Sequence, residues 1–284
     1  MRWQTWARGG VVIAGLGCAM AVYLLFGQRH VPAPAPVPAV DPTTTSQMGA
    51  GTIDRSKDGR PSLHIEFGGR TTFADNRVRF DRAYVHVFDE RGLEMWADQV
   101  ETEGKSVQAD NPALLQLRGH VRLLTKDGLE SLMDRATYNN VTGMFDTPGE
   151  LTFTKGRMSG DGVGASYDEK ADVLLLLDRA HVVMAPDAQG SGALDATSRQ
   201  ITLNRPARVV RFDGDARIVR DGDTLSGELA VAHTTEDESR MTRIELRSRA
   251  RVTPGDGKGA SAPPRMSADD IDLDFHEDGQ TIRH

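Results

Sequence analysis

The residues of this 284-residue chain that could do chemistry are few and scattered. Residues 160–164 have the glycine spacing of a phosphate-binding loop, but they lack the lysine and the following helix that such a loop requires. Residues 213–215 and 221–223 resemble fragments of calcium loops, yet no glutamate follows where a bidentate ligand is needed. All three segments are therefore expected to be turns or turn-rich strand starts.

Histidine and serine give no catalytic or metal-binding pattern either. The histidines of the body stand singly, with a spacing that matches no metal signature: His64, His86, His120, His181, His233 and His276. Serines are common, but none lies in the strand–turn–helix setting of a nucleophile. We therefore expect no catalytic residue, no metal and no cofactor, and we predict that the protein is not an enzyme.

The composition argues against several classes of protein. The formal net charge is −7, with basic residues dispersed, whereas nucleic-acid-binding proteins usually carry a basic stripe. Aromatic residues make up 6% of the chain, too few for base-stacking platforms. The single cysteine, Cys18, leaves no intrachain disulfide and no zinc site of the cysteine type.

A five-residue pattern recurs five times: a small residue, any residue, an apolar one, any residue, an apolar one. Its copies begin at Gly119, Gly149, Ala180, Gly214 and Ser248, with spacings of 30, 31, 34 and 34 residues. Such a period is typical of stacked units, each too small to bury its own apolar face. The small residue is expected at a tight bend or a bulge, where side-chain bulk would interfere.

Short alternating runs such as 77–80, 84–88 and 209–212 are typical of half-buried strands. Turn signals such as Asn139-Asn140 and Asp213-Gly214 separate them, and no run of ten residues after position 30 shows clean helical periodicity. We predict an all-β fold in which each repeat is a strand, a turn and a second strand that reaches the small-residue corner.

Alternation also predicts which apolar side chains share the inward face. The candidates are Val121, Leu123, Phe145, Leu151, Phe153, Leu175, Leu177, Val182 and Met184. They could line an open apolar groove or form the core of an ordinary closed sandwich, and the pattern is compatible with both.

The N-terminal segment predicts a membrane anchor. Residues 9–27 carry no charged side chain, and nineteen residues of helix span roughly 28 Å, close to the hydrocarbon thickness of a bilayer. Arg2 and Arg8 precede the span and Arg29 follows it, which slightly favours a cytoplasmic N-terminus. We expect an uncleaved anchor over residues 1–30, with a cleaved signal peptide as the alternative.

A linker is expected between the anchor and the body. Every second residue of 31–38 is proline, which predicts an extended polyproline spacer. The polar residues that follow extend the expected linker to 31–57. The body then divides into 58–188 and a further set of repeats, 189–284. The last unit stops at His284 before its expected corner, so either the polypeptide continues or it ends in an unpaired edge strand.

The segment from about Asp58 to Met184 resembles the LptC family of lipopolysaccharide-export proteins. More broadly, it is similar to the OstA-like repeat that this family shares with its periplasmic partner LptA. The likeness rests on residues 58–61, 119–123, 138–139 and 160–168, and on the order of anchor, spacer and repeat. The resemblance implies an open β-jelly roll, in which two sheets fold over an apolar interior like a taco.

The resemblance also implies a function and partners. Lipid A acyl chains of lipopolysaccharide would lie between the sheets against the inward candidates, and an inner-membrane ABC transporter would supply the work. The body would stand in the periplasm of a Gram-negative-type cell and join an LptA-like bridge protein, or its own C-terminal repeats, edge to edge. The predicted edge residues are Leu63, Ile65 and Phe67 in the first strands, and Ile271, Leu273 and Phe275 in the last.

Other interpretations stay open. A typical family member would end near Met184, whereas the repeats here continue through Val252, so residues 189–284 read as an LptA-like extension. Acidic residues of the last strand could protect an edge from aggregation instead of serving a partner. The body could also be a periplasmic scaffold without lipid cargo. A polysaccharide-acting β-solenoid is disfavoured, because its coils are shorter than these repeats and carry clustered acids.

Overall fold

The computed structural model describes residues 44–88, 92–103, 114–186, 188, 192–220, 222–236, 240–255 and 264–276. The predicted anchor at 1–30 and the proline spacer lie outside these residues. Within the described ranges the chain forms seventeen strands and no helix, so the all-β prediction is confirmed. The described part accordingly contains no helix long and apolar enough to cross a bilayer.

The strands follow one another along the chain as β1 (Thr44–Met48), β2 (Gly51–Lys57), β3 (Arg60–Phe67), β4 (Gly69–Phe73), β5 (Arg77–Val87), β6 (Leu93–Glu103), β7 (Leu114–Leu124), β8 (Glu130–Asn139), β9 (Met144–Lys155), β10 (Met158–Asp168), β11 (Val173–Met184), β12 (Leu194–Ser198), β13 (Gln200–Asn204), β14 (Val209–Arg220), β15 (Asp223–Thr234), β16 (Met241–Thr253) and β17 (Met266–Asp274).

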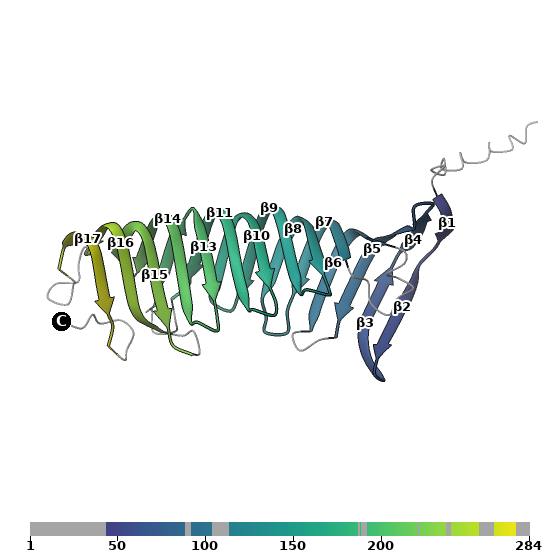
Figure 1. The fold of residues 1–284 in the computed structure, drawn as a ribbon, viewed down its shortest axis with the longest axis horizontal. Coiled ribbons are helices and arrows are strands. Elements are labelled where there is room, and N and C mark those ends of the chain that lie inside the picture. The colour runs from purple at the N-terminus through teal and green to yellow at the C-terminus, as the bar shows by residue number, and fades with distance from the viewer. Residues whose placement is uncertain are drawn as a thin grey trace, which may run out of the picture. The chain divides into compact units, whose positions relative to one another are not determined.

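Antiparallel pairing of neighbours makes the body a ladder of hairpins from β5 to β17 (Figure 1). One rung is shared by two short strands, because β12 and β13 both pair with β11 on one side and β14 on the other. At the start of the ladder β3 and β4 share β5 in the same way, while β2 pairs with β3 and β1 with β4. Each short pair is therefore one long strand, interrupted at Arg199 or at Gly68.

A line of corners crosses the middle of the ladder. The five predicted corner residues lie on β7, β9, β11, β14 and β16, where the pairing of each strand shifts register. Gly119, Gly214 and Ser248 have φ values of 75°, 80° and 60°, and Arg179, just before Ala180, has 48°. Left-handed residues break the pleat and bend a strand. The corner prediction is confirmed, and so is the two-strand repeat, since the corners fall on alternate strands.

A sixth copy of the pattern precedes the five that the sequence reading recognised. Ala83, Val85 and Val87 on β5 have the same spacing of small and apolar residues, and all three are buried. Arg82 just before them has a φ of 51°, as expected at a corner. The copy lies 36 residues before Gly119, a longer spacing than the 30 to 34 residues that separate the other copies.

Each long strand bends at its corner, so its two halves lie in two layers that face each other (Figure 1). Apolar side chains of both layers fill the space between them, and Phe80, Leu117 and Leu246 have no exposed surface. Burial of this kind supplies about 25 cal/mol per Å² of apolar surface. The architecture is the pair of folded-over sheets that was expected.

The ends of the two layers away from the corners form two rims. We call the turns after β7 (125–129) and β9 (156–157) the first rim, together with the other turns on that side. The turns after β8 (140–143), β10 (169–172) and β13 (205–208) belong to the second rim. The two rims border the open side of the interior.

Two boundary predictions need correction at the start of the body. Residues 44–48 and 51–57, expected to belong to the linker, form β1 and β2, because a polar strand needs few inward apolar groups when it lies at an edge. Since β2 pairs along one side of β3 and β5 along the other, the predicted edge at β3 is wrong. Leu63, Ile65 and Phe67 are core residues, 2%, 2% and 6% exposed.

The other end of the ladder is β17, which pairs with β16 and with no other strand in the described ranges. Ile271 and Leu273 on β17 and Phe275 just after it are buried, so these side chains do not face outward along the ladder. The expected division at 188/189 falls between β11 and β12, inside one compact unit that runs from Thr43 onward.

Candidate functional site

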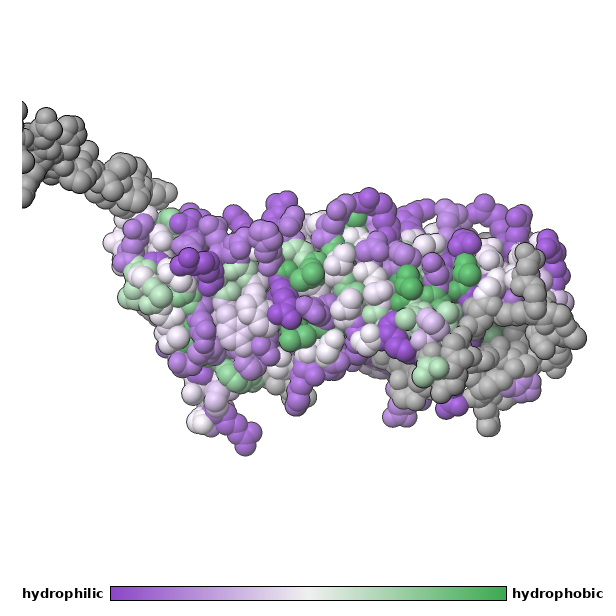
Figure 2. Space-filling model, turned by 180° about the vertical axis from the view of Figure 1, so that it is seen from behind, coloured by the Kyte–Doolittle hydropathy of each residue, from purple (hydrophilic) through white to green (hydrophobic). Residues whose placement is uncertain are grey.

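Two adjoining cavities lie between the layers, with volumes of about 530 and 600 Å³. Each is in the size range of cavities that bury a small ligand. Their shared lining residues are Asp127, Phe153, Met158, Leu174 and Leu203. The cavities are therefore two parts of one space, which we call the channel. Figure 2 shows apolar groups gathered along the middle of one face of the body, among hydrophilic ones.

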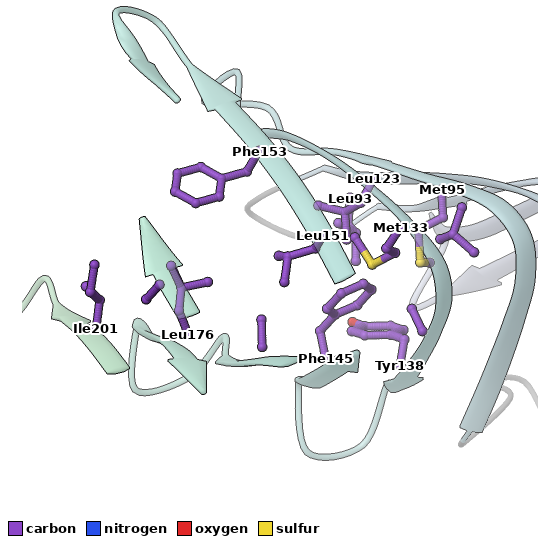
Figure 3. Packing of buried hydrophobic residues seen from close by; sticks show 14 of the residues in the cluster. Leu93, Met95, Leu123, Met133, Tyr138, Phe145, Leu151, Phe153, Leu176 and Ile201 are labelled. Atoms are coloured by element: carbon purple, nitrogen blue, oxygen red, sulfur yellow. The ribbon is translucent and has the colours of Figure 1, made fainter. Parts of the chain in front are cut away.

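Side chains from both layers project into the channel (Figure 3). Leu151 and Phe153 extend from the second half of β9, while Tyr138 and Phe145 come from the facing layer. This arrangement follows from local sequence, because alternation on a pleated strand sends every second side chain to one face. The corner keeps that face inward on both halves of β9, so one strand lines both walls.

The structure places seven of the nine predicted inward residues in the interior. Leu123, Phe145 and Leu151 line the first cavity, Val182 and Met184 line the second, and Phe153 lines both. Val121 is wholly buried in the adjoining core. Whether these residues contact lipid stays a prediction.

The inward placement is wrong for Leu175 and Leu177. Leu177 is 45% exposed, and Leu175 is half-buried and lines neither cavity. Their neighbours Leu174 and Leu176 line the channel instead. The error has a physical cause: residues 173–177 are all apolar, so alternation gives a strand without showing which face is inward.

The sequence reading also missed the lining residues beyond Met184. Ile201, Phe212 and Ile218 line the second cavity and are nearly fully buried. The signal was present for Ile218, which occupies the last position of the pattern that begins at Gly214, as Leu123 does in the pattern at Gly119. The same inward assignment, applied to the repeat that begins at Gly214, predicts that Ile218 faces inward.

A charged cluster lies where the two cavities meet. Lys155 Nζ donates a hydrogen bond to Asp127 Oδ2 at 2.6 Å, and Arg205 Nη1 reaches the same oxygen at 3.5 Å. Thr125 Oγ1 donates to the other carboxylate oxygen. Burial raises the pKa of Asp127, but these hydrogen bonds and the charges of Lys155 and Arg205 outweigh it and lower the pKa to about 2. The carboxylate is therefore ionised at neutral pH.

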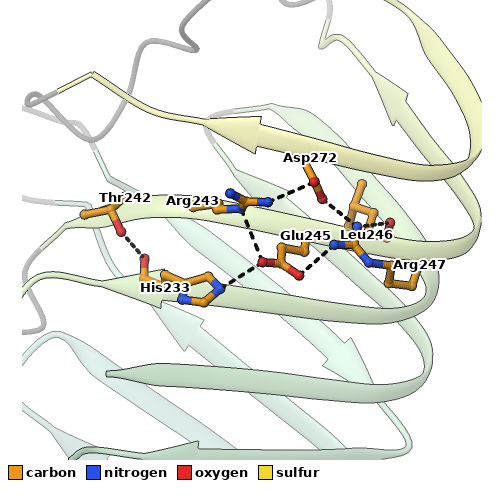
Figure 4. A network of polar contacts seen from close by, with 7 residues as sticks. All are labelled: His233, Thr242, Arg243, Glu245, Leu246, Arg247 and Asp272. Atoms are coloured by element: carbon orange, nitrogen blue, oxygen red, sulfur yellow. Dashed lines mark hydrogen bonds and ion pairs between the residues drawn. The ribbon is translucent and has the colours of Figure 1, made fainter. Parts of the chain in front are cut away.

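Charges on the outer face of the last strands pair with one another (Figure 4). Asp272 on β17 accepts from Arg243 at 2.8 Å and from Arg247 at 2.5 Å, and both arginines also contact Glu245 on β16. His233 on β15 extends the network to Glu245 at 3.3 Å. The acidic face expected on β17 is thus partly neutralised by β16, and these pairs fasten the last strand to the ladder.

Comparison with protein-family models finds no match, and no curated protein matches the chain. Among solved structures, the chain is similar to LptH, described as the LptA-homologous periplasmic component of the conserved lipopolysaccharide transport device from Pseudomonas aeruginosa. The superposition has a TM-score of 0.38 at 16% sequence identity, and it covers 51% of this chain and 95% of LptH.

Proposed function

We propose that this protein is a periplasmic carrier in lipopolysaccharide transport that holds acyl chains in its channel. The observation that carries the proposal is the continuity of the channel, whose two apolar cavities share five lining residues from both layers. The likeness of residues 58–184 to the LptC family and its OstA-like repeats supplies the class of cargo. We propose a carrier rather than an enzyme.

Burial of the hydrocarbon would drive binding. Each methylene transferred from water to an apolar interior contributes about 0.8 kcal/mol, so ten methylenes give roughly 8 kcal/mol before the cost of ordering the chain. Leucine, phenylalanine and methionine side chains make no directional contacts with hydrocarbon. A bound acyl chain can then shift along the channel without breaking a hydrogen bond at each step, as a carrier requires.

We also propose a direction of transport, from the membrane end of the body toward β17. The anchor predicted at residues 1–30 would hold the body beside an inner-membrane ABC transporter, which would load the channel. The edge of β17 that pairs with no other strand of the described residues would continue the ladder into the next protein of a bridge by β-augmentation. The repeats from β12 to β17 would lengthen the channel along which acyl chains move.

Binding to purified protein separates lining residues from their neighbours. We expect Leu174→Gln to weaken binding of lipopolysaccharide about tenfold or more, because the new amide would lie against hydrocarbon in both cavities. Leu175→Gln is the matched control, since the adjacent side chain lines neither cavity. Equilibrium titration with fluorescently labelled lipopolysaccharide measures both affinities.

The same titration can contradict the proposal. If the two variants bind lipopolysaccharide equally well, the channel is not the binding site. If the unaltered protein binds none, the scaffold without lipid cargo becomes the better interpretation.

A further inference from the structure

An ion pair crosses the open side of the channel. Asp127 belongs to the turn after β7 on the first rim, and Arg205 belongs to the turn after β13 on the second rim. They are 78 residues apart in sequence, yet Arg205 Nη1 lies 3.5 Å from Asp127 Oδ2. Both side chains line the first cavity, and Asp127 also lines the second. The pair therefore bridges the rims where the two cavities meet.

Each half of this bridge is held in place on its own rim. The turn that carries Asp127 is closed by Gly128 N–H donating to the Thr125 carbonyl at 2.9 Å, and Lys155 at the end of β9 holds the carboxylate. On the second rim, Arg205 N–H donates to the Asp172 carbonyl at 3.3 Å, and the guanidinium lies 3.7 Å from the Asp172 carboxylate. The contact between Asp127 and Arg205 joins the two sides.

A second contact crosses the open side farther along the ladder. Arg220 ends β14 on the first rim, and its guanidinium carbon lies 4.9 Å from the ring centre of Phe275, which follows β17 on the second rim. Both residues are nearly buried, at 9% and 7% exposed. Arg220 also lines the second cavity. The Asp127–Arg205 pair thus crosses between the rims at the first cavity, and the Arg220–Phe275 contact does so at the second.

We propose that Asp127 and Arg205 form an ionic clasp that closes the side of the channel, so that lateral access to the interior requires the pair to separate. The inference rests on the proposed function for the identity of the cargo, but the closure itself does not. The geometry suits a clasp that opens, because the Asp127 side chain is 47% exposed and the pair is long. Such a half-exposed ion pair is weak and sensitive to salt.

Spin labels on the two rims can measure the closure without any lipid. Cysteines would replace the exposed residues Lys126 and Ala207 in a full chain that carries Cys18→Ser, and electron–electron resonance would give the distance between the labels. We expect Asp127→Asn and Arg205→Gln to lengthen and broaden this distance, because each removes one charge of the clasp. Arg205→Lys keeps the charge and should preserve the distance.

A matched control uses an ion pair that bridges no rims. Glu150 and Arg179 lie on β9 and β11 with an N–O distance of 3.1 Å, and both are well exposed. Glu150→Gln should leave the label distance unchanged. If Asp127→Asn leaves it unchanged too, while the protein remains folded, the clasp proposal is overturned.

Uptake of a fluorescent fatty acid by the unlabelled full chain gives the second readout. We expect Asp127→Asn and Arg205→Gln to accelerate uptake roughly two- to fivefold, the range that an exposed ion pair supports. Longer label distances with an unchanged uptake rate would overturn the claim that the clasp controls lateral access. Longer distances in variants that bind no acyl probe at all would support the clasp and contradict the proposed carrier function instead.

Discussion

At the scale of single residues, close approach between strands decides which glycines are essential. A Cβ added at Gly160 on β10 would lie 2.5 Å from the backbone oxygen of His181 and 2.5 Å from the Phe153 ring. The backbone oxygen belongs to the paired strand β11 and cannot move away without breaking the ladder. Gly149, although it is one of the five corner residues, has no atom within 4 Å of its would-be Cβ, and its φ lies outside the left-handed region.

These two glycines give a matched stability prediction. Gly160→Ala should lower the free energy of unfolding by about 1–3 kcal/mol, the usual cost of overpacking. Gly149→Ala should be neutral or raise it by about 0.4–1 kcal/mol, because alanine restricts the unfolded chain. Urea unfolding of the purified full chain measures both changes, and equal losses at the two positions would contradict the claim that close approach between strands makes Gly160 essential.

At the scale of elements, the alternating sequence predicts the strands and their corners well, and it fails where alternation stops. The corner residues Gly119 and Gly214 can be recognised in the sequence, because a small residue interrupts an otherwise alternating run. Leu175 and Leu177 were assigned to the wrong face, since a run of five consecutive apolar residues does not show which of them face inward. The structure pairs β11 with β10 so that Leu174 lies opposite Tyr167, and this register decides which side chains of β11 face inward.

The charged clasp could not be read from the sequence at all. Asp127 and Arg205 sit in polar turns like those elsewhere in the chain, and nothing in their spacing links them. Strands β8 to β13 lie between the two turns in the sequence, and only the fold brings Arg205 Nη1 to 3.5 Å from Asp127 Oδ2. A contact between turns this far apart in sequence is visible only in the folded structure.

The first hairpin supplies a pH-dependent prediction at this scale. His64 on β3 contacts Asp54 on β2 at 2.6 Å through Nδ1, and Glu66 at 3.0 Å through Nε2. These hydrogen bonds favour the protonated ring and raise the pKa of His64 above its usual value of 6.5. The stability that they give the β2–β3 pair is therefore complete below pH 6.5, and it is lost as the pH rises through the raised pKa of the folded state.

NMR titration of the His64 ring should give a pKa above 6.5 in the native protein. Asp54→Asn should bring this pKa back toward 6.5, since it removes the larger of the causes. Unfolding measured on either side of neutrality should show a pH dependence that His64→Gln reduces. A His64 pKa at or below 6.5 in the unaltered protein would contradict the assignment.

At the scale of the whole folded body, the repeat converts short strands into a long apolar interior. Each hairpin adds two bent strands, and each bend places one half-strand in either layer, so the channel lengthens with the number of repeats. The repeats after Met184 are part of the same ladder, and the second cavity draws most of its lining from them. Extension of the family-like segment therefore extends the proposed path for acyl chains.

Photocrosslinking in cells tests the central claim most directly, that acyl chains lie between the two layers. A photoreactive residue would replace either member of two adjacent pairs, Leu176 with Leu177 and Phe153 with Thr152. The first member of each pair is buried in the interior and the second faces outward. The account predicts that labelled lipopolysaccharide attaches at positions 176 and 153 and not at 177 and 152. Equal labelling of both members of each pair, or labelling of neither, would contradict it.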